Sequence, residues 1–231
     1  PITGLLPFTV LIRAIILFPK IKEWRNFAKI LIMTKIPTSL YSEATPNPRV
    51  MKFTANRMLV DQNIYEFNNR AEASASPLAL ELFGFPFVES VFISNNFISI
   101  TKKDNGIEWS DIILEMREFI RDYLVDGGSV INEDASPKKS KTVTHKEELK
   151  REFSDIEKKI ADLLDEYVRP AVEQDGGFIS LKKFEKGIVT VSLQGACSGC
   201  PSSSMTLKSG IEGLLKREMP EEIVEVIADN D

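Results

Sequence analysis

The residues best suited to chemistry are two cysteines, Cys197 and Cys200, in the run GACSGCP. Thiolates bind soft metal ions and iron–sulfur clusters or exchange disulfides, so a pair separated by two residues predicts one of these activities. The chain has no other cysteine. A disulfide between such close neighbours would close a tiny loop and stabilise little, and a secreted disulfide framework needs more cysteines. We therefore interpret the pair as chemical and expect a reducing compartment.

The elements on either side of the pair bear on its reactivity. Alternating apolar residues predict a strand at 188–193, and Pro201 is well placed as the first residue of a helix. Cys200 would then stand at the N-cap, where unpaired backbone N–H groups and the positive end of the helix dipole favour thiolate over thiol. Small neighbours would let the backbone approach a bulky cluster and donate N–H bonds to its sulfurs. These neighbours are Gly195, Ala196, Ser198 and Gly199.

A CxxC spacing alone leaves several interpretations open. Thiol–disulfide exchange is one, although Pro201 follows the second cysteine instead of lying between the two. Structural zinc needs about four ligands, and the chain offers two cysteines and a remote His145. Two inert buried cysteines are a third interpretation. Iron–sulfur clusters usually take four cysteine ligands, so a second chain, another protein or a small thiol would have to complete the site. This deficit predicts a labile, cluster-bridged dimer, which suits a carrier.

Length and composition are those of a globular protein. A chain of 231 residues with 43% hydrophobic and 27% charged residues suits one ordinary domain or two small ones. The formal net charge of -5 gives no support to nucleic-acid binding, which requires a basic face. The cysteine-bearing part, 153–231, holds nine basic and 15 acidic residues. The part of the chain that contains both cysteines is therefore acidic.

The first 32 residues differ from the rest. They hold five basic residues and one acid, and their apolar stretch from Leu5 to Phe18 is shorter than the roughly 20 residues of a membrane-spanning helix. Three hypotheses fit: translated upstream sequence with the true start at Met33, a transit peptide, or a membrane or export signal. We expect a cytoplasmic protein without membrane partners, or a mitochondrial matrix protein if 1–32 is a transit peptide.

The pattern from residue 40 to residue 127 predicts a small α+β domain. Asn95-Asn96 separates two β-branched and aromatic runs, which indicates a hairpin. Ser76-Pro77 is typical of a helix start, and Ser110 is expected to cap a second helix that Gly127-Gly128 ends. The expected elements are a strand at 50–53, a helix from 76 to 84, strands at 87–94 and 97–102, and a helix from 110 to 127.

Residues 128–146 are polar and predict a flexible linker, and residues 147–231 predict a second α+β domain. Its first helix is expected to bury a stripe that includes Tyr167 and to stop at Pro170. A three-stranded sheet with two helices should result. The expected elements are a helix at 147–168, strands at 178–184 and 188–193, a helix from 201, and a strand within 222–228.

Two stretches of the second domain, LLDEYVRPAVEQDGGFISL and VTVSLQGACSGCPSSSMTLKSGIEGLLKREMPE, closely resemble the C-terminal domain of the NifU family. The stretches TPNPRVMKF and LFGFPFVESVFISNNFISITK of the first domain resemble the Nfu N-terminal domain. Together these likenesses extend over nearly everything from Thr45 onward. The chain therefore resembles the Nfu-type iron–sulfur scaffolds and carriers, without the central ferredoxin-like domain and the N-terminal assembly domain of nitrogenase NifU.

This resemblance implies a function. Cys197 and Cys200 would be the ligands of a cluster, most often 4Fe-4S but with 2Fe-2S also possible, that bridges a homodimer. The protein would receive the cluster from an upstream assembly scaffold and pass it to apo-proteins without turning over a substrate. The first domain has no cysteine, so we expect it to recognise clients or to modulate the other domain. Exposed aromatic residues could serve that role, with Phe85, Phe87 and Phe92 as candidates. A thiol–disulfide redox protein and a pure adaptor are the competing hypotheses.

Overall fold

The structure is a computed structural model that describes residues 35–61, 63–132, 153–198 and 201–229. It has the expected α+β fold, with an N-terminal and a C-terminal domain that each combine one sheet with helices. The predictions for residues 1–32, Met33 and His145 lie outside the described residues, as do the first residues of the helix expected from 147. The prediction of one helix from 147 to 168 is wrong, because Ser154 is extended and forms a capping box with Glu157, so that a helix begins at Asp155. Among the helices of the described ranges, none is long and apolar enough to cross a membrane.

The N-terminal domain is built on a five-stranded antiparallel sheet in the order β1-β2-β5-β4-β3. The predicted hairpin is confirmed: Asn95 adopts a positive φ of 46° between β4 and β5, a conformation that asparagine tolerates better than most residues. The sequence pattern predicts neither the first nor the third of these strands. The strands are β1 (Leu40–Ala44), β2 (Val50–Ala55), β3 (Ile64–Phe67), β4 (Val88–Ser94) and β5 (Phe97–Lys102).

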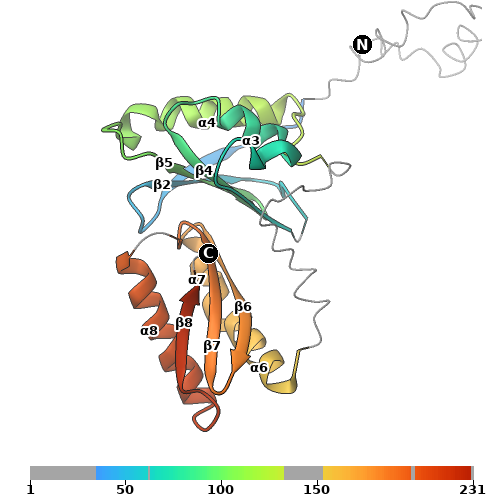
Figure 1. The fold of residues 1–231 in the computed structure, drawn as a ribbon. Coiled ribbons are helices and arrows are strands. Elements are labelled where there is room, and N and C mark those ends of the chain that lie inside the picture. The colour runs from blue at the N-terminus through green and yellow to red at the C-terminus, as the bar shows by residue number, and fades with distance from the viewer. Residues whose placement is uncertain (1–34, 62, 133–152, 199–200, 230–231) are drawn as a thin grey trace, which may run out of the picture. The chain divides into compact units, whose positions relative to one another are not determined.

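The helices of this domain cover one face of the sheet (Figure 1). They are the short 3-10 helix η1 (Glu72–Ala75), α3 (Pro77–Leu82) and α4 (Trp109–Val125). The predicted cap of α3 is confirmed, because the Ser76 hydroxyl accepts a hydrogen bond of 3.0 Å from the Ala79 N–H. The core between the sheet and α4 contains the fully buried side chains of Phe53, Ile98, Ile100, Met116 and Ile120.

The start of α4 differs from the prediction. Glu108 holds the N-cap position, without a side-chain capping bond, and the helix already includes Trp109. The Trp109 ring packs edge-on against Phe53 with ring centroids 6.3 Å apart. This burial draws the tryptophan into the first helical turn and puts Ser110 inside the helix, where its hydroxyl donates to Asp111 instead of capping. Tertiary packing therefore overrides the local capping signal.

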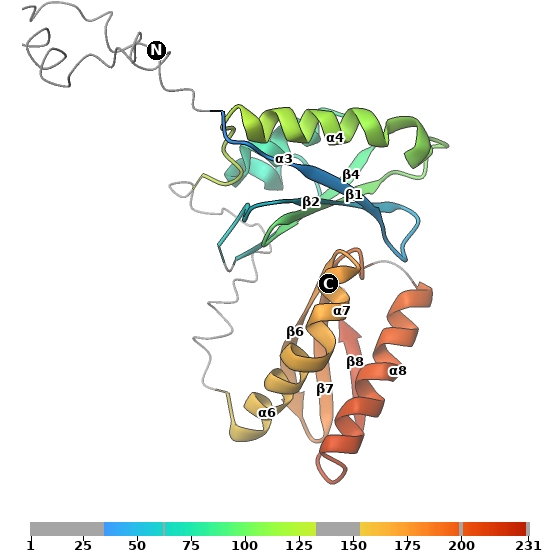
Figure 2. The same cartoon turned by 180° about the vertical axis from the view of Figure 1, so that it is seen from behind.

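The C-terminal domain has a three-stranded sheet in the order β6-β7-β8. Strands β6 and β7 are antiparallel, and β7 and β8 are parallel because helix α8 crosses over between them. Figures 1 and 2 show α6, α7 and α8 on the same face of this sheet. The elements are α6 (Asp155–Leu163), the π-helix η2 (Leu164–Val168), α7 (Arg169–Gln174), β6 (Gly177–Glu185), β7 (Ile188–Gly195), α8 (Pro201–Glu218) and β8 (Glu225–Asp229).

Two predictions for the first helix of this domain are wrong, and one feature explains both. The helical path does not stop at Pro170. Helix α7 begins directly after the π-turn Leu164–Val168, so Pro170 lies in the first turn of α7, where no backbone N–H is needed. The π-turn also changes the phase of the buried stripe. Leu164 is followed by buried Val168, whereas Tyr167 is 56% exposed.

Candidate functional site at the cysteine loop

The cysteine loop joins the end of β7 at Gly195 to the start of α8 at Pro201. Pro201 is the first residue of α8, as predicted, so Cys200 directly precedes an 18-residue helix. The structure describes the loop as far as Ser198. It therefore locates Cys197, whereas Cys200 and its geometry lie outside the described residues.

Backbone hydrogen bonds hold the base of this loop. The Ala196 N–H donates to the Gly176 carbonyl oxygen over 3.2 Å. The Ser198 N–H and hydroxyl both donate to the Gly195 carbonyl oxygen, over 3.1 and 2.8 Å. Gly177 pairs with Gly195 in the β6/β7 ladder, so the glycine turn and the cysteine loop meet at the same end of the sheet. Cys197 is thus fixed by a short network that the two turns share.

Gly177 is the residue that makes room for the thiol. A Cβ atom at this position would lie 2.7 Å from Cys197 Sγ and 2.7 Å from the Gln194 carbonyl oxygen, both closer than side-chain carbons ordinarily come. The sequence predicted only a turn at Gly176-Gly177. Gly176 confirms that turn with a φ of +81°. No local pattern indicates the role of Gly177, since the contact joins β6 to the loop that follows β7.

Gly195 is required for two reasons. Its φ is +64°, in the left-handed region that side chains with a Cβ adopt at a cost. A Cβ atom there would also lie 2.8 Å from the Gly176 carbonyl oxygen, which accepts the Ala196 hydrogen bond. The sequence indicated only that a small residue stands here. The structure shows that the backbone conformation itself turns the chain out of β7 and into the cysteine loop.

The surroundings of Cys197 are apolar. Its side chain is 7% exposed and belongs to the core cluster of the domain, together with Leu193 and Ile211. A thiolate in such surroundings requires a compensating charge, since burial of an isolated ion is costly. The iron of a cluster would supply this charge, and the start of α8 would add the positive end of its dipole. The donor chemistry of the loop therefore fits iron–sulfur binding.

Helix α8 is tied to the sheet by Glu212. The Val226 N–H of β8 donates to the Glu212 carboxylate over 3.1 Å, and Lys216 Nζ lies 2.6 Å from the same carboxylate. The hydrogen bond from Lys216, with a further contribution from the Val226 N–H, holds the pKa of Glu212 below its usual value. Lys216 and Arg217 stand in the last turn of α8, where they complement its dipole. These contacts fix the helix whose start follows the cysteines.

No group of three or more His, Cys, Asp and Glu side chains suited to a metal ion occurs in the described parts of the chain. Cys197 is accordingly the only described residue of the predicted ligand pair. Of the two site residues proposed from the sequence, the structure therefore locates Cys197. Cys200 is known only as the residue that precedes Pro201 in the sequence.

Comparisons with known families give a consistent result. A family model described as "Scaffold protein Nfu/NifU N terminal" matches residues 40–127, and one described as "NifU-like domain" matches residues 160–227. A human relative named "NFU1 iron-sulfur cluster scaffold homolog, mitochondrial" is 34% identical over 193 residues, which make up 83% of this chain and 73% of the relative. The relative of the same name from Drosophila sechellia is 38% identical over 82% of this chain and 65% of its own length.

Among solved structures, the solution NMR structure of a NifU-like protein from Saccharomyces cerevisiae is 24% identical to this chain. The match covers 42% of this chain and 86% of the yeast chain, with a TM-score of 0.35. The matched part of this chain spans about two thirds to three quarters of the human and Drosophila sechellia relatives.

Proposed function

We propose an iron–sulfur cluster scaffold and carrier function on the premise that this chain belongs to the Nfu/NifU scaffold family, as the two family models and the human relative show. The observation that carries the proposal is the position of Cys197. It lies at the end of β7, in a glycine-shaped loop that leads directly through Cys200 into the start of α8. Cys197 and Cys200 would bind the cluster as thiolates.

The ligand count supports a shared cluster. Each chain supplies two cysteines, whereas a closed cluster usually takes four. Two chains that each contribute one CxxC pair would complete the site across a two-fold axis. The 4Fe-4S type is the form we propose, with 2Fe-2S as the alternative that the same ligand count allows. A cluster held between subunits is easier to release than one enclosed in a single fold.

Release of the cluster is the expected purpose of this arrangement. The chain would accept a cluster from an upstream assembly scaffold and deliver it to apo-proteins, with the cluster as cargo and no substrate turned over. The related proteins are named as mitochondrial, which favours the mitochondrial matrix over the cytoplasmic location predicted from the sequence. The basic, nearly acid-free segment 1–32 is compatible with a transit peptide in this proposal.

Anaerobic reconstitution of the full chain with iron and sulfide tests the proposal. We expect a brown dimer with about four irons per two chains. Cys197→Ser and Cys200→Ser should each abolish the colour and the iron content. Ser209→Ala is the matched control, because Ser209 is an exposed residue of the same helix and the change leaves both thiols in place.

Two other results would contradict the scaffold proposal. A colourless monomer that reduces disulfides and loses this activity in either cysteine variant would identify a thiol–disulfide redox protein. A chain whose binding to apo-proteins survives substitution of both cysteines, and which takes up no iron, would identify an adaptor.

A further inference from the structure

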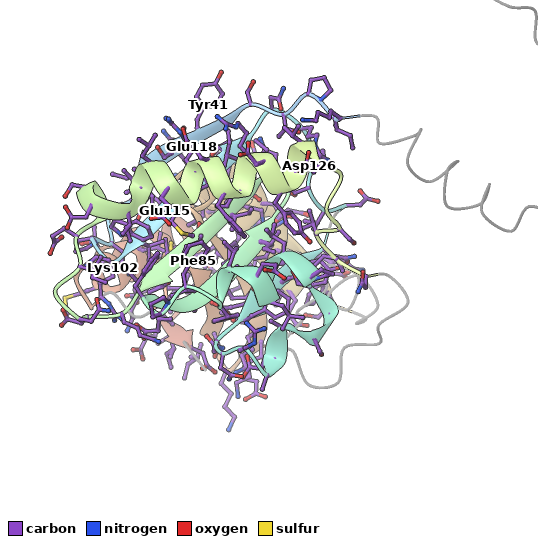
Figure 3. The ribbon with its side chains drawn as sticks, turned by 90° about the horizontal axis from the view of Figure 1, so that it is seen from above. Tyr41, Phe85, Lys102, Glu115, Glu118 and Asp126 are labelled. Atoms are coloured by element: carbon purple, nitrogen blue, oxygen red, sulfur yellow. The ribbon has the colours of Figure 1, made fainter. Side chains whose placement is uncertain are left out.

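A second surface with the character of a binding site lies in the N-terminal domain, on the outer side of α4. It is an open depression of about 450 Å³, which we call the α4 groove. Figure 3 looks down on α4, with Glu115, Glu118 and Phe85 labelled. The groove is lined by Phe85, Asp111, Leu114, Glu115, Glu118 and Phe119.

The floor of the groove is aromatic. Phe85 and Phe119 contact each other edge to face, with ring centroids 5.1 Å apart, and both pack against the hydrophobic core. Of the aromatic candidates predicted for partner recognition, Phe87 and Phe92 are buried, whereas Phe85 is partly exposed at this groove. The Leu114 side chain stands beside the floor and is 56% exposed. An apolar side chain from a partner would contact the two rings below it and Leu114 at its side.

The rim of the groove is negative. Asp111, Glu115 and Glu118 follow one another at helical spacing along one face of α4, where like charges repel. None of the three forms an ion pair with a cation in the described part of the chain. Arg121 of the same helix pairs with Asp122 instead, so the rim presents three exposed carboxylates to solvent. A basic partner would pair with these carboxylates and cover the apolar floor at the same time.

We propose that the α4 groove binds a short cationic, amphipathic peptide segment of a partner protein. Lysine or arginine side chains of this segment would pair with the carboxylates of the rim, and one apolar side chain would sit on Phe85 and Phe119 beside Leu114. Charge complementarity with the groove identifies the partner chemistry. This inference concerns a different domain from the cysteines, so its outcome does not depend on cluster binding.

The test measures binding of a fluorescein-labelled peptide, built of leucine and lysine at helical spacing, to the full chain by fluorescence anisotropy. A peptide of the same composition in scrambled order, and one with glutamate in place of lysine, serve as comparison probes. We expect the amphipathic peptide to bind at least about fivefold more tightly than the scrambled one, since only helical spacing presents an apolar side chain together with flanking charges. The glutamate peptide should not bind.

Matched variants localise the binding. E115Q/E118Q should weaken it about fivefold or more, while E221Q/E222Q, which removes the same charge from exposed residues of the other domain, should change it less than about twofold. Leu114→Ser should weaken binding about fivefold, whereas Met58→Ser, at a residue 57% exposed, should leave it unchanged. All six residues changed in these four variants are exposed, so circular dichroism should show unchanged folding.

Three outcomes would overturn the proposal. Equal weakening by E115Q/E118Q and E221Q/E222Q would mean that the peptide responds only to overall charge. Concentration-dependent self-association of the peptide-free chain that E115Q/E118Q abolishes would assign the groove to a second copy. Competition by millimolar calcium or magnesium, lost in the same variant, would assign it to a divalent cation.

Discussion

Gly177→Ala is the substitution whose effect follows most directly from the geometry of the cysteine loop. The new Cβ would lie 2.7 Å from Cys197 Sγ, and ordinary contacts begin at 3.4 Å, so the sulfur would have to move by about 0.7 Å. The backbone oxygen of Gln194, also at 2.7 Å, cannot move without disturbing the β6/β7 pairing. Overpacking of this kind costs about 1–3 kcal/mol.

Stability and cluster loading provide the two assays. A loss of about 2 kcal/mol corresponds to a Tm lower by roughly 8–16 °C for a domain of this size. Iron retained after reconstitution should fall as well, because the displaced sulfur is one of the proposed ligands. Gly210→Ala is the control: its Cβ would meet nothing within 4 Å, and alanine is favoured in a helix interior, so stability should rise by about 0.5–1 kcal/mol.

A double-mutant cycle isolates the contact with sulfur. Cys197→Ala removes Sγ, so Gly177→Ala should cost less in that background, with a coupling of about 1 kcal/mol. The contact with the Gln194 oxygen remains and preserves part of the cost. The reasoning would be refuted by a Gly177→Ala protein that melts at the wild-type temperature and retains the wild-type amount of iron.

Three further predictions concern Gly195, Glu212 and Tyr123. Gly195→Ala should lower stability by about 1–3 kcal/mol in urea denaturation, because φ is +64° and the new Cβ meets the Gly176 oxygen; wild-type stability would contradict the left-handed conformation. The lowered pKa of Glu212 means that its stabilisation is present above the ordinary glutamate pKa and is lost as pH falls through the lowered value. Glu212→Gln should therefore lower Tm at neutral pH and cease to do so in acid, whereas a constant difference would argue against the ionised contact. The pKa of Tyr123 is raised by burial and then by Glu81, so spectrophotometric titration should show its phenolate forming at higher pH than in the unfolded chain. Stability should be lost as pH rises through that raised pKa, and an ordinary tyrosine titration would contradict this.

Local signals in the sequence were sufficient for much of the fold. The Ser76-Pro77 start, the asparagine hairpin and the start of α8 at Pro201 are each set by a few adjacent residues, and all three are confirmed. Features that depend on distant partners were not predictable in this way. The parallel pairing of β8 follows from the crossover of α8, and the burial of Trp109 moved the start of α4 away from the cap signal.

In the candidate site, too, local features were predictable and features that depend on distant residues were not. The sequence identified the cysteine pair and its small neighbours, because spacing and residue type are local properties. It missed the reason for Gly177, since only the folded β6/β7 ladder places that glycine against Cys197 Sγ. It also missed the π-turn at Leu164–Val168, which shifts the buried stripe so that Val168 is buried and Tyr167 is exposed.

Native mass spectrometry of the reconstituted full chain, kept anaerobic, tests the central claim most directly. We expect a dimer whose mass exceeds that of two chains by one cluster, and its conversion to cluster-free monomers when a chelator removes the iron. Mixing with a tagged Cys197→Ser/Cys200→Ser chain should yield no cluster-bearing mixed dimer, because such a pair has only two of the four ligands. A cluster bound to a single chain, or a dimer that persists unchanged after iron removal, would contradict the account.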